Sequence, residues 1–171
     1  MKDIQQRADE AKAKGFICVT GALIVNNEGN IFVHKRSPDR KLFPGCWDIV
    51  GGHIEESETV HEALLREITE ETSWTLDDVE ELVEEREWED SEGNKHKEFI
   101  FLASVEGDLE NPILEEGKVS EGRWVSPSEL SVLLENREPG DTYIRDVVAS
   151  GFKALERRAK KNESPDSGMD R

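Results

Sequence analysis

A chain of 171 residues is long enough to bury one hydrophobic core, so we expect a single domain. The 39 acidic and 22 basic residues give a net charge of −17, which argues against the basic footprint of a nucleic-acid-binding protein and against attraction to an anionic membrane. No apolar run approaches the ~20 residues of a membrane span, and the first residues lack the apolar stretch of a secretory signal. We therefore expect a cytoplasmic protein that binds neither DNA nor a membrane.

The pattern of apolar residues, turn residues and helix caps predicts helices and strands along most of the chain. In chain order they are a polar helix over 2–14, a hairpin of strands over 16–25 and 31–35, a strand over 47–50, a helix over 59–72, strands over 79–88, 96–105 and 123–125, a helix that begins at 127, and an amphipathic helix over 142–160. Residues 161–171 are polar without apolar periodicity, which predicts a disordered tail. The expected domain is therefore residues 1–160, with 1–14 as its N-terminal helix.

The helix predicted over 59–72 begins with a capping box, because Thr59 is followed three residues later by Glu62. Its apolar residues define one side of the helix. They are Val60, Ala63, Leu64, Leu65 and Ile68. On a helical wheel Glu71 lies about 20° from the mean direction of these residues, Glu67 about 60° and Glu70 about 120°.

Glu67, Glu70 and Glu71 have the i, i+3, i+4 spacing that makes their carboxylates close neighbours. A solvated acidic face is the ordinary interpretation of such a cluster, but it would place the acids opposite the apolar side. Carboxylates on the inward side repel one another and lose hydration, so a positive group must accompany them. Arg66 is one candidate, and a divalent cation is the other. Oxygen ligands select hard ions such as Mg²⁺ or Mn²⁺.

A glycine pair, Gly51-Gly52, separates the strand over 47–50 from this helix. Glycines at the end of a strand let the backbone approach a ligand closely, and a helix N-terminus favours an anion. The order of strand, glycine turn and acidic helix is therefore typical of a site for a metal–phosphate complex.

The same segment resembles the signature of the Nudix hydrolases, G-x5-E-x7-R-E-U-x-E-E-x-G-U, in which U is a bulky apolar residue. The matching residues, in register, are Gly52, Glu58, Arg66, Glu67, Ile68, Glu70, Glu71 and Trp74. Only the last glycine departs from the pattern, since Ser73 stands there. The resemblance covers about residues 16–157. It implies an α+β fold with a mixed β-sheet sandwiched between helices, in an α/β/α arrangement.

By this resemblance the chain hydrolyses a diphosphate bond in a nucleoside di- or triphosphate, or in a nucleoside diphosphate linked to another group, with Mg²⁺ as cofactor and Mn²⁺ as a substitute. A small-molecule substrate of this kind is the expected partner, and the chain is expected to be a monomer or homodimer. The implied roles are metal ligation by Glu70, Glu71 and a carbonyl near Gly52, metal ligation or base catalysis by Glu67, orientation of the glutamates by Arg66, and support of the site by Gly51 and Glu58.

Many members of the family use a further acid from a late loop as ligand or base. Glu121, three residues before Trp124, is similar to that acid, and Glu116 is the second choice. Arg36 is similar to a position that touches substrate phosphate or sugar. Arg36 also belongs to a basic cluster with Arg40 and Lys41, for which phosphate steering and surface solubility both remain open.

Two alternatives accompany this hypothesis. The isopentenyl diphosphate isomerases are similar around Lys41–Asp48, but their chemistry needs a cysteine in the strand after the tryptophan, whereas Cys46 precedes it here. A non-catalytic ligand-sensing domain of the same fold is the other alternative. Such proteins usually lose the glutamates that this chain keeps.

Overall fold

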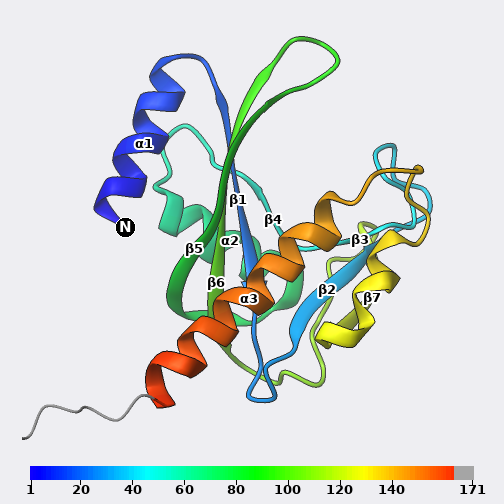
Figure 1. Ribbon diagram of the computed structural model, residues 1–171. Coiled ribbons are helices and arrows are strands. Elements are labelled where there is room, and N and C mark those ends of the chain that lie inside the picture. The colour runs from blue at the N-terminus through cyan, green and yellow to red at the C-terminus, as the bar shows by residue number, and fades with distance from the viewer. Residues whose placement is uncertain (164–171) are drawn as a thin grey trace, which may run out of the picture.

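The structure is a computed structural model that describes residues 1–163, so most of the tail expected over 161–171 lies outside the described residues. Figure 1 follows the course of the chain. The elements are α1 (Lys2–Ala13), β1 (Ile17–Ile24), β2 (Ile31–Arg36), β3 (Trp47–Asp48), β4 (Val50–His53), α2 (Val60–Thr72), β5 (Thr75–Glu89), β6 (Lys95–Glu106), β7 (Val119–Val125), the 3₁₀ helix η1 (Pro127–Leu134) and α3 (Tyr143–Glu163).

The strands form two sheets. The larger has the order β4-β1-β6-β5, in which β1 and β6 run parallel and the other neighbours run antiparallel. The smaller has the order β3-β2-β7 and is antiparallel throughout. The mixed pairing and the helices confirm the expected α+β fold, although the strands divide between two sheets.

The expected hairpin of strands 16–25 and 31–35 is wrong in its pairing. Because β4 and β6 already flank β1 on both edges, β2 meets the end of β1 only through the single bridge Val25↔Ile31. Strand β2 instead takes its hydrogen bonds from β3 and β7. The chain thus passes from the larger sheet to the smaller one between β1 and β2.

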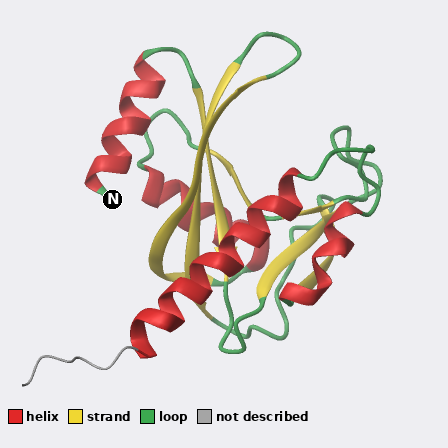
Figure 2. Ribbon diagram, viewed as in Figure 1, coloured by secondary structure: helices red, strands yellow, loops and turns green. Residues whose placement is uncertain are grey.

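Helices cover both faces of the larger sheet, as Figure 2 shows. One hydrophobic cluster packs α1 and α2 against one face and includes Ala8, Leu64, Phe99 and Trp74. A second cluster packs α3 and η1 against the other face, where Phe152 is one of the buried residues. No helix within residues 1–163 combines the length and apolar character needed to span a bilayer.

Helix α2 begins and ends where the sequence predicts. The Thr59 hydroxyl accepts a hydrogen bond from the backbone N–H of Glu62 at 3.1 Å, which satisfies one of the free donors at the helix start. Ser73 adopts the left-handed conformation with φ 63° and ψ 9°, and its N–H donates to the carbonyl of Thr69. The two capped ends define where α2 starts and stops, and therefore which side of the helix each acidic residue occupies.

Several other boundaries differ from the expectation. Helix α3 continues to Glu163, three residues past the expected end at 160. The positive charges of Lys160 and Lys161 in its last turn interact favourably with the negative, C-terminal end of the helix dipole. The helix expected from 127 is a 3₁₀ helix. Strand β7 begins at Val119, four residues before the expected start at 123, because it pairs with β2 as far as Arg36.

Candidate active site

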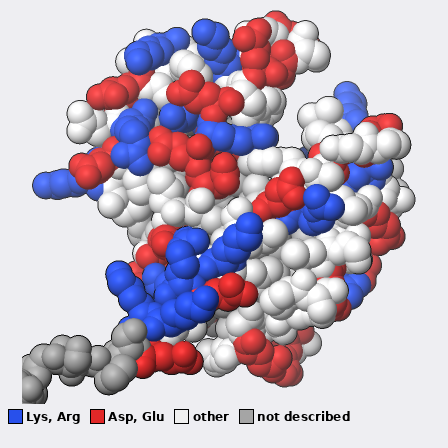
Figure 3. All heavy atoms as spheres, viewed as in Figure 1, with Lys and Arg blue, Asp and Glu red and all other residues white. Residues whose placement is uncertain are grey.

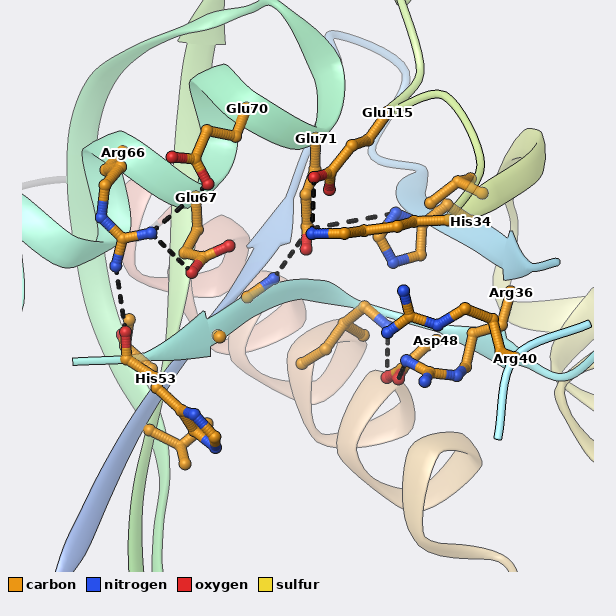
Figure 4. Close-up of a pocket in the computed structure, with 18 of the residues that line it drawn as sticks. His34, Arg36, Arg40, Asp48, His53, Arg66, Glu67, Glu70, Glu71 and Glu115 are labelled. Carbon is orange, nitrogen blue, oxygen red and sulfur yellow. Dashed lines mark hydrogen bonds and ion pairs between the residues drawn. The ribbon is translucent and has the colours of Figure 1, made fainter. Parts of the chain in front are cut away.

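A cavity of about 520 Å³ lies where α2, β4, β2 and the segment before β7 meet (Figure 4). Its lining is mostly charged and polar. The charged and histidine residues among the lining are His34, Arg36, Arg40, Asp48, His53, Arg66, Glu67, Glu70, Glu71, Glu98, Glu115 and Lys118, and Gly51 and Gly52 are also part of it. The structure thus brings together the acidic helix and the glycine pair that the sequence singled out.

The glycines allow the strand and helix to approach one another. A Cβ atom at Gly51 would lie 2.3 Å from the Thr20 carbonyl oxygen on the neighbouring strand. A Cβ atom at Gly52 would lie 2.3 Å from Oε1 of Glu67. A side chain at Gly51 would therefore clash with the backbone of β1, and one at Gly52 would displace the Glu67 carboxylate of α2.

Three glutamates of α2 form one wall of the cavity. Oε2 of Glu71 accepts a hydrogen bond from the Gly51 N–H at 3.0 Å, and the side chains of Glu71 and Glu67 are each 13% exposed. The Glu70 side chain is 50% exposed. The order of burial agrees with the helical wheel, in which Glu70 lies furthest from the apolar side.

Arg66 holds this acidic wall in place. Its Nε and Nη2 donate to the two carboxylate oxygens of Glu58 at 2.7 and 2.8 Å, and Nη1 donates to Oε1 of Glu67 at 2.9 Å. Nη2 also donates to the His53 carbonyl at 3.0 Å. The hydrogen bonds between Arg66 and Glu58 lower the pKa of Glu58 and raise that of Arg66, so both remain charged.

Burial acts against the charged form of the two inner glutamates. It raises the pKa of Glu71 to about 9, and the nearby carboxylate of Glu67 adds to the effect. Burial also raises the pKa of Glu67, although Arg66 opposes it. Arg66 alone therefore does not neutralise the negative charges of Glu67 and Glu71. A further cation beside Glu71 would lower the free-energy cost of ionising the Glu71 carboxyl group.

Basic side chains supply the facing wall. Arg36 donates from Nε to the Leu42 carbonyl at 2.8 Å, and its Nη1 lies 3.8 Å from an oxygen of Asp48. Arg40 and Lys118 line the same cavity, whereas Lys41 lies in a shallow hollow outside it. Of the three basic residues singled out in the sequence, Arg36 and Arg40 therefore share a cavity with the acidic helix, and Lys41 does not.

The late acid in the cavity is Glu115. Glu121 lies on β7 opposite Lys35 and lines a second hollow, while Glu116 is exposed and outside the cavity. An irregularity between β2 and β7 at Lys35/Arg36 sends Val119 to the first cavity and Glu121 to the second. Glu115 reaches the cavity from the turn before β7, where Nζ of Lys118 pairs with it at 2.8 Å.

His34 and Asp48 are cavity residues that the sequence analysis missed. They are register partners across β2 and β3, and both line the cavity. Burial, with help from Arg36, lowers the pKa of His34 to about 4, so the imidazole is neutral near pH 7. Burial raises the pKa of Asp48. The alternation of β2 could have placed His34 beside the basic Arg36, but its burial depends on packing against α2.

These donors suit a divalent cation. Glu67, Glu70, Glu71 and Glu115 offer carboxylate oxygens, and Gly52 keeps space beside Glu67 that a Cβ atom would fill. Within residues 1–163, no three His, Cys, Asp or Glu side chains already stand together as a ready-made metal cluster. Since carboxylates repel one another without a cation, we expect them to draw closer around an ion.

Comparisons with known proteins agree with this geometry. The NUDIX domain family matches residues 17–147, a range that contains every residue lining the cavity. An uncharacterised Nudix hydrolase of Nostoc sp. is 30% identical over 149 residues, covering 84% of this chain and 85% of that protein. The nucleoside triphosphatase NudI of Escherichia coli K12 is 32% identical over 118 residues, covering 63% of this chain and 80% of NudI.

Among solved structures, the MutT protein of Methanosarcina mazei Go1 aligns with a TM-score of 0.62 at 27% identity, covering 85% of this chain and 96% of that chain. The sequence and structure comparisons therefore both lead to proteins named as Nudix hydrolases or MutT.

Proposed function

The chain belongs to the Nudix hydrolase family, whose members act on diphosphate bonds, and we propose that it is a Mg²⁺-dependent pyrophosphohydrolase of nucleotides. The proposed substrate is a nucleoside di- or triphosphate, or a nucleoside diphosphate linked to another group. The observation that carries the proposal is one cavity with the glutamates of α2 on one wall and Arg36, Arg40 and Lys118 on the other. Such a cavity can hold cations and a phosphate chain together.

Each wall has a distinct task in this proposal. When bound, Mg²⁺ neutralises phosphate oxygens and lowers the pKa of water. Glu70, Glu71 and Glu115 would hold it, and the carbonyl near Gly52 is within the same wall. Arg66 occupies Oε1 of Glu67, which leaves Oε2 free to hold a cation or to accept a proton from the attacking water.

The basic wall would position the phosphate chain. The guanidinium groups of Arg36 and Arg40 can each form paired hydrogen bonds with phosphate oxygens. Arg36 is already fixed by the Leu42 carbonyl, so it loses little freedom when it binds. The similarity to the nucleoside triphosphatase NudI supports a nucleotide as the molecule that carries these phosphates.

The isomerase alternative receives no support from the cavity. The Cys46 thiol is buried, donates to the carbonyls of Pro44 and Asn136, and is not among the lining residues. The ligand-sensing alternative would fit a cavity that had lost its carboxylates. Here the three glutamates of α2 all line it.

A substrate panel tests the proposal. The protein with Mg²⁺ would be given nucleoside triphosphates, oxidised nucleoside triphosphates, dinucleoside polyphosphates, nucleotide sugars and ADP-ribose, and the released products would be identified by chromatography. We expect hydrolysis of at least one class, with loss of activity in EDTA and recovery when Mg²⁺ is restored. Absence of hydrolysis across the panel, or activity unchanged by EDTA, would contradict the proposal.

A further inference from the structure

His34 carries a polar atom in the cavity wall that no protein group satisfies. Its side chain is 5% exposed, and Nδ1 has no hydrogen-bond partner among the described residues. A buried polar group without a partner destabilises the folded protein, because it has lost its hydrogen bonds to water and gained none in return. Because such atoms are rare in folded proteins, an unpaired ring nitrogen on a residue that lines a cavity points to a ligand that completes it.

The position of this nitrogen is well defined. His34 lies on β2, the middle strand of the smaller sheet, between Asp48 on β3 and Gly122 on β7 in the strand register. The preceding residues Phe32 and Val33 are fully buried. The backbone of His34 is therefore fixed by its neighbouring strands, so the position of the imidazole is set by the fold and does not depend on a ligand.

The nearest acidic atom is Oε2 of Glu71, 4.0 Å from Nδ1. This distance is too long for a hydrogen bond. Two ligand atoms that each lie about 2.1 Å from one ion are about 3.0 Å apart at a right angle and about 4.2 Å apart on opposite sides. The observed separation falls within the range for two atoms that share one ion.

A third donor approaches the same place. Figure 4 shows Glu115 extending toward Glu71 and His34 from the segment between β6 and β7. All three side chains line the one cavity and come from different elements, α2, β2 and the turn before β7. A cation there would join the helix to the smaller sheet.

We propose that Nδ1 of His34 is a direct ligand of a divalent ion shared with the Glu71 carboxylate. This inference rests on the proposed function, because it adds a nitrogen to the metal site of that same cavity. Imidazole nitrogen suits first-row transition ions, whereas Mg²⁺ is held by oxygen and readily keeps water in place of a protein ligand. The site therefore binds Mn²⁺ more tightly than Mg²⁺, and His34 is the residue that sets this preference.

Pulsed electron paramagnetic resonance of the Mn²⁺-loaded protein tests the inference directly. Mn²⁺ bound to imidazole shows a coupling to the ligand nitrogen. We expect this coupling in the wild-type protein, and we expect its pattern to change from that of ¹⁴N to that of ¹⁵N when histidine is labelled with ¹⁵N. Labelling requires no mutation, so this result does not depend on whether a variant folds.

Variants then assign the coupling to one residue. His34→Asn and His34→Gln should lose it and should lower Mn²⁺ affinity by about tenfold or more, with a smaller change in Mg²⁺ affinity. His61→Asn is the matched control, since His61 is exposed on α2 and is not a cavity residue. It should retain both the coupling and the affinity.

Mn²⁺ that binds without a histidine coupling, or a coupling that persists in His34→Asn, would overturn the inference. Equal losses of Mn²⁺ and Mg²⁺ affinity would also overturn it, because they would assign His34 a purely structural role. If the wild-type protein nevertheless hydrolyses a nucleotide with Mg²⁺, the proposed function stands. Failure of the proposed function itself would appear as absence of hydrolysis in the substrate panel.

Discussion

Arg66 organises the site by its shape as well as its charge. One planar guanidinium meets both oxygens of Glu58, an oxygen of Glu67 and the His53 carbonyl. These bonds connect α2 to the segment that follows β4. An ammonium group on a flexible stem has the same charge but lacks the fixed fork that makes these contacts together.

Arg66→Lys should therefore reduce nucleotide hydrolysis by about tenfold or more while the protein stays folded. We expect this loss because Glu67 would no longer be held by the guanidinium group, although the net charge of the protein stays the same. Activity and circular dichroism would be measured beside Arg145→Lys, which alters an exposed ion pair with Asp146. Equal activity in the two variants would show that the fork has no part in positioning the glutamates.

Ser73 occupies a left-handed position that favours glycine, with φ 63°. Non-glycine residues there cost about 1–2 kcal/mol, part of which the greater unfolded-state freedom of glycine cancels. Ser73→Gly should raise the free energy of unfolding by about 0.5–1 kcal/mol and leave hydrolysis unchanged. Urea denaturation would measure it.

Ser91→Gly provides the comparison for Ser73→Gly, because Ser91 is not among the residues with positive φ. It should give no gain in stability. If Ser73→Gly were no more stable than Ser91→Gly, the strain assigned to the end of α2 would be wrong.

Among the elements, α2 is the one whose structure and chemistry were largely predictable from sequence. Its start depends on Thr59 and Glu62, three residues apart, and the inward direction of Glu71 depends only on helical periodicity. Local rules of this kind need no knowledge of the rest of the fold. The match between predicted and observed burial of the glutamates follows from them.

Residues that enter the cavity from other elements were less predictable. His34 and Asp48 come together through the pairing of β2 with β3, and Glu115 rather than Glu121 lines the same cavity. These relations join segments far apart in the sequence. Spacing along the chain carries no direct signal for them, so the structure was needed to identify them.

Helix α1 stabilises the start of α2. Oε1 of Gln5 accepts a hydrogen bond from the N–H of Val60 at 2.8 Å, a donor that has no partner within α2. Gln5→Ala should therefore lower the free energy of unfolding by about 1 kcal/mol. Gln6→Ala, which removes only a contact with Glu10 inside α1, should have a smaller effect in the same denaturation assay. Equal effects would argue against this link between the helices.

The turn between β5 and β6 depends on one carboxylate. Asp90 accepts hydrogen bonds from the backbone N–H groups of Glu92 and Asn94 and pairs with His96 at 3.0 Å. The His96 ring holds the pKa of Asp90 well below its usual value, and the Asn94 N–H contributes. A carboxyl with a lowered folded pKa adds stability above its unfolded pKa and loses it as the pH falls toward the folded value.

Asp90→Asn should thus be less stable than the wild type at pH 7, and the difference should shrink as the pH falls below the ordinary Asp pKa of 3.8. Urea denaturation at pH 7 and pH 3 would measure the change. Asp78→Asn, which removes an exposed charge from β5, is the comparison variant in the same assay. A difference for Asp90→Asn that grew in acid would reverse the expected sign.

At the scale of the whole molecule, the net charge of −17 opposes the approach of an anionic substrate. Figure 3 shows basic side chains gathered over the C-terminal half of α3. Two of these, Arg157 and Arg158, lie 3.6 and 3.9 Å from Glu81 and Glu80 of β5. Basic groups in the cavity, together with a bound cation, must therefore provide the local attraction for phosphate.

In the proposed function, the inward carboxylates of α2 hold the cation that hydrolysis requires. Glu71→Gln keeps the size of the side chain and removes its charge, while Glu89→Gln makes the same change at an exposed residue of β5. The most direct test is the Mg²⁺-dependent hydrolysis rate of these two folded variants on the preferred nucleotide. We predict a loss of about 100-fold or more for Glu71→Gln and a rate close to wild type for Glu89→Gln. Equal rates for the two variants would contradict the claim.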